Sequence, residues 1–213
     1  MTGIFGAPVS GDTVVDDFAS LMALPSPADG QTAVVVAPVI GTLLAGGIPR
    51  TRWVYIGGDG WRLDGLQQLL SAVLAVSGTS STAEQTLLEV DIAAGLVPAL
   101  RQIDISAVAG RDGTTDQITL RARIGGSSVS SQPATTGTQR SISFMSQMAL
   151  TSDTSLRAIW NGLGTVGGGG SGAVQPSTYT VPSMASTQQL SFSVQMAGTT
   201  NIGSLYYACV VGY

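Results

Sequence analysis

The sequence predicts a mainly β protein whose C-terminal part is a jelly-roll-like antiparallel β-sandwich. Three alternating runs carry this prediction: TLLEVDI (86–92), RQIDISAVA (101–109) and QITLRARI (117–124), with turn-rich segments between them. Apolar side chains recur at every second residue, as in a strand with one buried and one solvated face. Further runs up to the C-terminal YYACVVGY bring the total to roughly eight strands over residues 81–213, which fits two packed sheets.

Residues 1–30 are expected to form an N-terminal arm with one short helix, because Gly and Pro interrupt any longer regular element. Asp16 or Asp17 can cap this helix, and Pro25 ends it. Adjacent carboxylates could also serve acid–base chemistry, but on an exposed turn they are more typical of a helix cap. We therefore expect a structural role for this pair.

Residues 31–64 predict a small β unit. A strand that Pro38 ends or bulges precedes a hairpin in which RWVYI and WRL flank the turn GGDG. Gly and Asp suit the positive φ angles of such a turn. Trp53, Tyr55 and Trp61 are expected to supply the hydrophobic core of this unit rather than a binding groove.

Residues 65–80 are expected to form a helix and a hinge. Apolar residues from Leu66 to Leu74 recur at i, i+3, i+4, i+7 and i+8, which predicts an amphipathic helix. The segment SGTSST that follows is typical of a flexible polar linker. Two arrangements stay open: the helix joins identical chains in a bundled neck, or it lies against the β domain of its own chain.

The chain is poor in the residue types on which most catalytic sites depend. It contains no His and a single Cys, Cys209, which lies in an apolar run and is expected to be buried. The chain's two Glu residues, Glu84 and Glu89, cannot supply the thiolate cluster of a zinc site. A glycosidase needs only two carboxylates, and the candidates are Asp91, Asp104, Asp112, Asp116 and Asp153. Their outward strand positions and predicted turns favour structural roles, so we expect no enzyme activity, no catalytic residue, no cofactor and no metal.

The segment VGGGGSG at 166–172 is predicted to be a flexible loop. A run of Gly can cradle a phosphate, but a P-loop also needs a Lys-Ser/Thr pair and a helix after it. Neither feature follows this segment, so phosphate binding is not expected here.

Charged residues make up only 10% of the chain, and 13 acidic residues against nine Arg give a net charge of −4. Nucleic-acid binding requires a basic stripe that neutralises phosphates, and the sequence has none. The longest apolar stretches, 33–40 and 66–76, are too short to cross a bilayer, and no secretory signal follows Met1. We expect a protein made in the cytoplasm, with much of its sparsely charged surface covered by other copies or by partner proteins.

Two stretches carry a family resemblance. TSSTAEQTLLEVDIAAGLVPAL, followed by QIDISAV and TDQITLRARIGG, resembles the β-sandwich module of structural proteins of tailed bacteriophages. The upstream LMALPSPADGQTAVVV and RTRWVYIGGDGWRLDG are similar to the small β unit near the start of many phage fibre proteins. The resemblance covers most of residues 20–213. It implies a virion protein of the tail-fibre, head-fibre or decoration type, often a homotrimer, although no long repetitive shaft is present.

The expectation that follows is a trimeric short fibre or spike on the head or tail of a virion. Its N-terminal region would dock onto other virion proteins, and its C-terminal sandwich would contact a glycan or protein of the host surface. The alternative is a decoration or cement protein that stabilises the capsid shell. A polysaccharide depolymerase is a third hypothesis, which the scarcity of acid–base residues disfavours. Neither nucleic-acid binding nor membrane insertion is expected.

Overall fold

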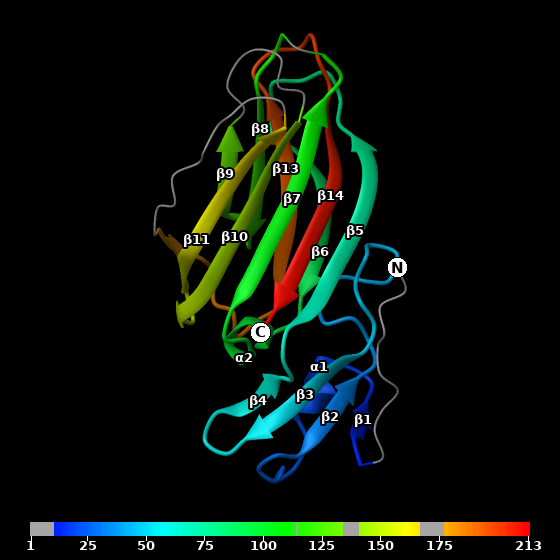
Figure 1. The fold of residues 1–213 in the computed structure, drawn as a ribbon, viewed down its shortest axis with the longest axis vertical. Helices are drawn as coiled ribbons and strands as arrows, with labels where there is room; N and C mark the ends of the chain where they lie inside the picture. Colours follow the sequence, from blue (N-terminus) through cyan, green and yellow to red (C-terminus); the bar gives the residue numbers. More distant parts are fainter. Residues whose placement is uncertain (1–10, 114, 134–140, 167–176) are drawn as a thin grey trace.

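The computed structural model describes residues 11–113, 115–133, 141–166 and 177–213, and in these residues the protein is mainly β. Its strands form three sheets: a small sheet at one end of the long axis and two larger sheets that pack face to face (Figure 1). The prediction of a mainly β protein with antiparallel sheets is confirmed. The Gly-rich segment predicted to be a loop lies, apart from its first residue, outside the described residues.

The small sheet contains four strands in the order β1-β2-β3-β4, of which only β1 and β2 are parallel. The strands are β1 (Thr13–Val15), β2 (Thr32–Val35), β3 (Thr51–Ile56) and β4 (Gly60–Leu63). β3 and β4 form the predicted hairpin, in which Gly58 and Gly60 adopt positive φ angles of 89° and 79°. Because β1 belongs to the sheet, part of the expected arm is an integral strand of this unit.

The predicted short helix is present as α1 (Phe18–Met22), and Asp17 is its N-cap. The Asp17 carboxylate accepts a 2.7 Å hydrogen bond from the Ser20 N–H, which satisfies one of the free amides of the first turn. α1 places Phe18 against Trp53, with ring centroids 5.0 Å apart. The Trp53 side chain is fully buried, so the prediction that the aromatic residues form the core of this unit is confirmed for it.

One large sheet has six strands in the order β12-β11-β10-β7-β14-β5, all antiparallel to their neighbours. The strands are β5 (Gln67–Ser77), β7 (Ile103–Arg111), β10 (Ser141–Ser152), β11 (Ser155–Val166), β12 (Thr178–Thr180) and β14 (Gly203–Gly212). The chain's last strand, β14, thus lies between the first strand of the sandwich and β7.

The other large sheet has four strands in the order β6-β13-β8-β9, also antiparallel. The strands are β6 (Gln85–Ile92), β8 (Ile118–Ile124), β9 (Ser127–Pro133) and β13 (Gln188–Met196), and the short helix α2 (Leu96–Ala99) follows β6. In β8 the four apolar side chains are fully buried and the alternate ones are partly exposed. The predicted alternation of this run is therefore confirmed.

The prediction of an amphipathic helix, made from the apolar spacing between Leu66 and Leu74, is wrong, because Gln67–Ser77 form β5. β5 pairs with β14 from Gln67 to Ser77, and the pairing slips twice, between Leu205 and Tyr207 and between Val210 and Val211. Leu69 is the extra residue at the slip between Val210 and Val211, which allows adjacent Leu69 and Leu70 both to be buried. The bulge hides the period-two pattern of a strand and leaves a spacing that resembles a helix.

The prediction of a flexible hinge after this element is also wrong. The turn that joins β5 to β6 is closed by Gln85, whose side chain accepts a 2.6 Å hydrogen bond from the Thr79 N–H and donates a 2.9 Å one to the Thr79 carbonyl. Ser80 donates a hydrogen bond to the Thr199 carbonyl in the neighbouring connection. Residues 78–84 are thus a hydrogen-bonded connection between two strands of the same sandwich, and they do not separate two units.

The small sheet and the sandwich share one hydrophobic core. The loop 37–50 crosses the end of the sandwich and forms bridges with both large sheets, at Ile40–Ile92 on β6 and at Gly47–Leu70 on β5. Gly47 is required there because a Cβ atom would lie 2.5 Å from the Ile40 carbonyl oxygen. The two units therefore hold a fixed relation to each other.

Trp53 provides a test of this shared core. Replacing Trp53 with Ala should lower the free energy of unfolding by about 3–5 kcal/mol, because it removes the largest fully buried side chain of the small unit. Urea unfolding monitored by circular dichroism measures this change. Val14→Ala, at a side chain 55% exposed, is the control and should change stability by about 0.5 kcal/mol or less. A Trp53→Ala protein as stable as the control would contradict the shared core.

Candidate functional site

The five Asp residues considered for glycosidase chemistry lie on several different elements. Asp91 is on β6, Asp104 is on β7, and Asp153 lies in the turn between β10 and β11. Asp112 and Asp116 share the connection between β7 and β8, but their carboxylates accept hydrogen bonds from backbone amides. Those two are thus engaged in holding loops together, as expected of Asp in turns.

Two connections, 197–202 and the described residues 112, 113 and 115–117, lie at the end of the sandwich remote from the small sheet and are joined by hydrogen bonds (Figure 1). Asn201 is buried there, and its side-chain oxygen accepts hydrogen bonds from the Thr115 N–H at 3.2 Å and the Asp116 N–H at 3.1 Å. In return, Asp116 accepts hydrogen bonds from the N–H groups of Thr200 and Asn201 at 2.8 and 2.9 Å. We call these two loops the distal loops. They form a rigid surface at the tip.

Asp104 lies in the middle of the outer face of the six-stranded sheet and is 8% exposed. Three neutral groups donate hydrogen bonds to its carboxylate: the Tyr213 hydroxyl at 2.9 Å, the Gln147 amide at 3.1 Å and the Gln102 amide at 2.7 Å. The hydrogen bond to Asp104, with burial as a second cause, raises the pKa of Tyr213. A carboxylate with this many donors is well satisfied, and its role is to anchor the C-terminal residue.

Glu84, just before β6, forms an ion-pair cluster with two Arg residues on the outer face of the four-stranded sheet. Arg123 donates two hydrogen bonds to its carboxylate, at 2.8 and 2.7 Å, and Arg121 lies 3.4 Å away. The hydrogen bond from Arg123 is the main cause that lowers the pKa of Glu84 from 4.5 to about 2, against an opposing effect of burial. Ser193 on β13 donates a further hydrogen bond. The cluster clamps the start of β6 onto β8 and β13.

Two other carboxylates, Glu89 and Asp91, take no part in this cluster. Glu89 and Asp91 on β6 would face Arg121 and Arg123 only if β6 and β8 were neighbours, but β13 lies between these two strands. Glu84 precedes β6 and contacts both Arg side chains. The alternating Arg121 and Arg123 are the part of this cluster that the sequence makes visible. No local pattern distinguishes Glu84 from the other carboxylates as the partner of these two Arg residues.

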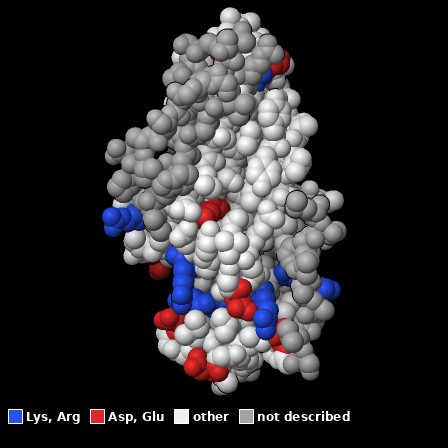
Figure 2. Space-filling view, in the orientation of Figure 1, with Lys and Arg blue, Asp and Glu red and all other residues white. Residues whose placement is uncertain are grey.

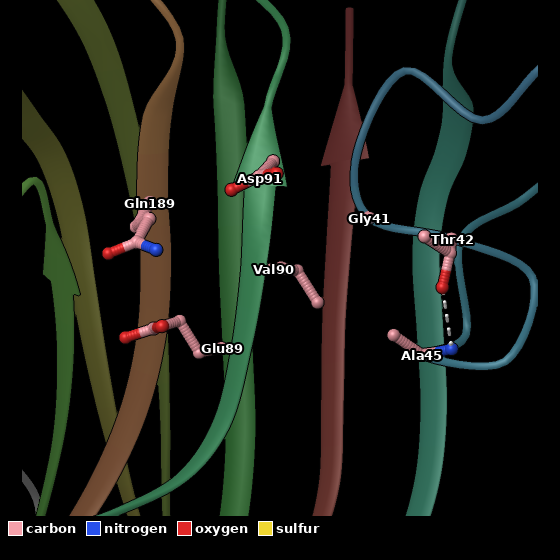
Figure 3. Close-up of a pocket in the computed structure, with 7 residues that line it drawn as sticks. All are labelled: Gly41, Thr42, Ala45, Glu89, Val90, Asp91 and Gln189. Atoms are coloured by element: carbon pink, nitrogen blue, oxygen red, sulfur yellow. Dashed lines mark hydrogen bonds between the residues drawn. The ribbon is translucent and has the colours of Figure 1, made fainter.

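A small cavity lies at the junction between loop 37–50 and the edge of the four-stranded sheet. Its volume is about 200 Å³, and its lining residues are Gly41, Thr42, Ala45, Glu89, Val90, Asp91 and Gln189. Figure 3 shows the side chains of Glu89, Asp91 and Gln189 projecting from β6 and β13, with the loop on the other side. These groups can bind hydroxyl or amine groups through hydrogen bonds. The cavity contains no nucleophile with an adjacent base, so its lining supplies no pair for covalent catalysis.

Charge is distributed unevenly over the surface. Figure 2 looks onto the outer face of the six-stranded sheet, where charged side chains gather toward the small sheet and the centre is uncharged apart from one acidic patch. Among the described residues, no group of three or more His, Cys, Asp or Glu is arranged to hold a metal ion. None of the described helices has the length and apolar character needed to span a membrane. Cys209 is buried, as expected from its apolar run.

The pH dependence of stability tests the Glu84 cluster. Because the folded-state pKa of about 2 lies below the ordinary 4.5, the stabilisation by Glu84 is complete above pH 4.5 and is lost as the pH falls toward 2. Glu84→Gln should lower the free energy of unfolding by roughly 1–2 kcal/mol at pH 7 and by much less at pH 2. Urea unfolding across this pH range measures the difference. The control is Glu89→Gln on β6, and equal behaviour of the two variants would exclude the clamp.

Hydrogen exchange tests the distal loops. Asn201→Ala should lower the free energy of unfolding by about 1–3 kcal/mol, because it leaves the amides of Thr115 and Asp116 without their acceptor. Exchange of these two amides should become faster, while the amides of β7 keep their protection. Thr199→Ala, an exposed neighbour in the same loop, is the matched control. Unchanged exchange in the Asn201 variant would show that the loops are held by other contacts.

Comparison with known proteins gave no match, either to a protein-family model or to a curated protein. The described site residues form structural clusters and one small polar cavity.

Proposed function

We propose that the chain is a structural protein of a tailed-phage particle, a short fibre or spike on the head or tail that contacts the host surface. The observation that carries this proposal is the difference between the two ends of one rigid, elongated body (Figure 1). The small sheet occupies one end, and the distal loops, held by Asn201 and Asp116, occupy the other. Loops on a rigid scaffold are well suited to recognition, and the small sheet is suited to docking.

The sandwich is assigned within this proposal to the jelly-roll class. A jelly roll distributes eight strands over two sheets, with the first, eighth, third and sixth strands in one and the second, seventh, fourth and fifth in the other. The orders β5-β14-β7-β10 and β6-β13-β8-β9 fit this scheme when β11 and β12 are treated as an insertion after the sixth strand. The inserted strands extend one margin of the six-stranded sheet.

The proposed assembly is a homotrimer on a virion. The scarcity of charge supports extensive contact with other copies or with virion proteins, because few charged groups would have to be desolvated. The weakly charged centre of the six-stranded sheet also favours the second candidate function, a decoration protein that packs laterally on the capsid shell (Figure 2). A depolymerase remains the third candidate. It is disfavoured because the chain has no His and two of the Asp candidates, Asp112 and Asp116, hold loops.

Particles that lack this chain distinguish attachment from shell stabilisation. If the chain is a spike, adsorption of these particles to the host should fall severalfold while their resistance to heating stays unchanged. Particles that adsorb normally but break at lower temperature would support the decoration protein and contradict the spike. Intact wild-type particles in which mass spectrometry detects no copy of the chain would reject both.

A competition experiment then tests the tip. Purified chain should reduce adsorption of wild-type particles, and Thr199→Arg should weaken this competition, because it adds a bulky charge to an exposed position of the distal loops. The matched control is Thr154→Arg, at an exposed position of the turn between β10 and β11, at the end of the sandwich opposite the distal loops. Equal competition by both variants would exclude the tip as the contact surface.

A further inference from the structure

One margin of the six-stranded sheet is formed by β5, which is covered over only half its length. Loop 37–50 covers the first half: Ile48 donates a 3.1 Å hydrogen bond to the Leu69 carbonyl, and Ser71 donates a 2.8 Å one to the Gly46 carbonyl. Beyond Ser71, no strand among the described residues pairs with this side of β5. We call the remaining segment, Val73–Ser77, the open edge.

The exposure of the side chains also distinguishes the covered half of β5 from the open edge. The side chains of Leu69 and Leu70 are fully buried, whereas Val73 is 86% exposed and Val76 is 38% exposed. Backbone groups in a strand point alternately to its two sides, and Leu69 and Ser71 direct theirs toward the margin. The N–H and C=O of Val73 therefore point to the margin as well, where no described strand receives them.

Three features that usually keep a sheet margin from pairing with another chain are absent from the open edge: charge, Pro and a covering strand among the described residues. A bulge at Leu74–Ala75, opposite Tyr206 of β14, lies within it. The whole of β5, QQLLSAVLAVS, contains neither a charged residue nor Pro. The other margins of the sandwich are protected. β6 carries Glu89 and Asp91, β12 is three residues long, and β9 is rich in Ser and ends at Pro133.

We propose that the open edge is the docking site for a second copy of the chain, whose own β5 pairs with it in antiparallel orientation. An antiparallel strand is self-complementary, because a two-fold axis brings the N–H groups of each copy opposite the C=O groups of the other. The absence of charge on β5 means that two identical edges do not repel each other. Val73 and Val76 add apolar surface that the contact would remove from water.

This contact goes beyond the proposed virion role and differs from a three-fold assembly. A two-fold contact joins copies in pairs, so it produces a dimer of single chains or, where trimers form through another surface, a pair of trimers. The purified chain is sufficient to test it. A negative result would leave the proposed role on the particle untouched, and failure of that role would leave this contact untouched.

Mass measurement of Val73→Lys tests the proposal. Val73 is almost fully exposed, so Lys should leave the fold intact while it places like charges on both sides of the contact. Light scattering should show that the mass of the wild-type assembly is twice that of the variant. The matched control is Thr86→Lys on β6, which should keep the wild-type mass. Equal masses for wild type and Val73→Lys would overturn the proposal.

Hydrogen exchange of the wild-type protein gives an independent test that needs no variant. The amides of the open edge should exchange slowly at high protein concentration and faster on dilution, while the amides of β7 should not respond. Fast exchange at every concentration would show that nothing covers the edge. Slow exchange at every dilution would show that the chain itself covers it, and either result would reject pairing between copies.

Discussion

The structure depends on the position of its last strand. β14 lies between β5 and β7, so the C-terminal strand closes the six-stranded sheet around the first strand of the sandwich. This pairing provides the backbone partners that make residues 67–77 a strand. It also brings Tyr213 to Asp104 and packs the backbone at Gly212 closely against Leu63 and Leu100, where a Cβ atom would crowd both side chains. The end of the chain is thereby joined to both units of the protein.

The junction between the small sheet and the sandwich is also rigid. Loop 37–50 forms bridges with β6 and β5, and a continuous hydrophobic core runs beneath it. A separate attachment domain on a flexible linker would be free to reorient, whereas this unit moves with the sandwich. The proposed spike therefore presents its distal loops at a fixed distance and direction from its docking end.

Three of the acidic residues have specific structural partners. Glu84 joins the start of β6 to β8 through Arg123, Asp104 holds Tyr213, and Asp116 joins the distal loops. The remaining surface of the six-stranded sheet is weakly charged, which lowers the cost of covering it with another protein. The open edge of β5 combines this weak charge with backbone groups that no described strand pairs. The two-fold contact and the virion role therefore follow from different features of the molecule.

The sequence alone determined the elements whose residues alternate without interruption. β8 and the β3–β4 hairpin were predictable because the burial of each side chain follows directly from its position along the strand. The cap at Asp17 was predictable because its partner, Ser20, is three residues away. Only the tertiary structure decided that residues 67–77 form a strand, since a bulge opposite β14 conceals the alternation. It also selected Glu84 as the partner of Arg121 and Arg123, and Asn201 as the centre of the distal loops. These contacts join residues more than 30 positions apart, and the order of the strands, which no local pattern encodes, brings them together.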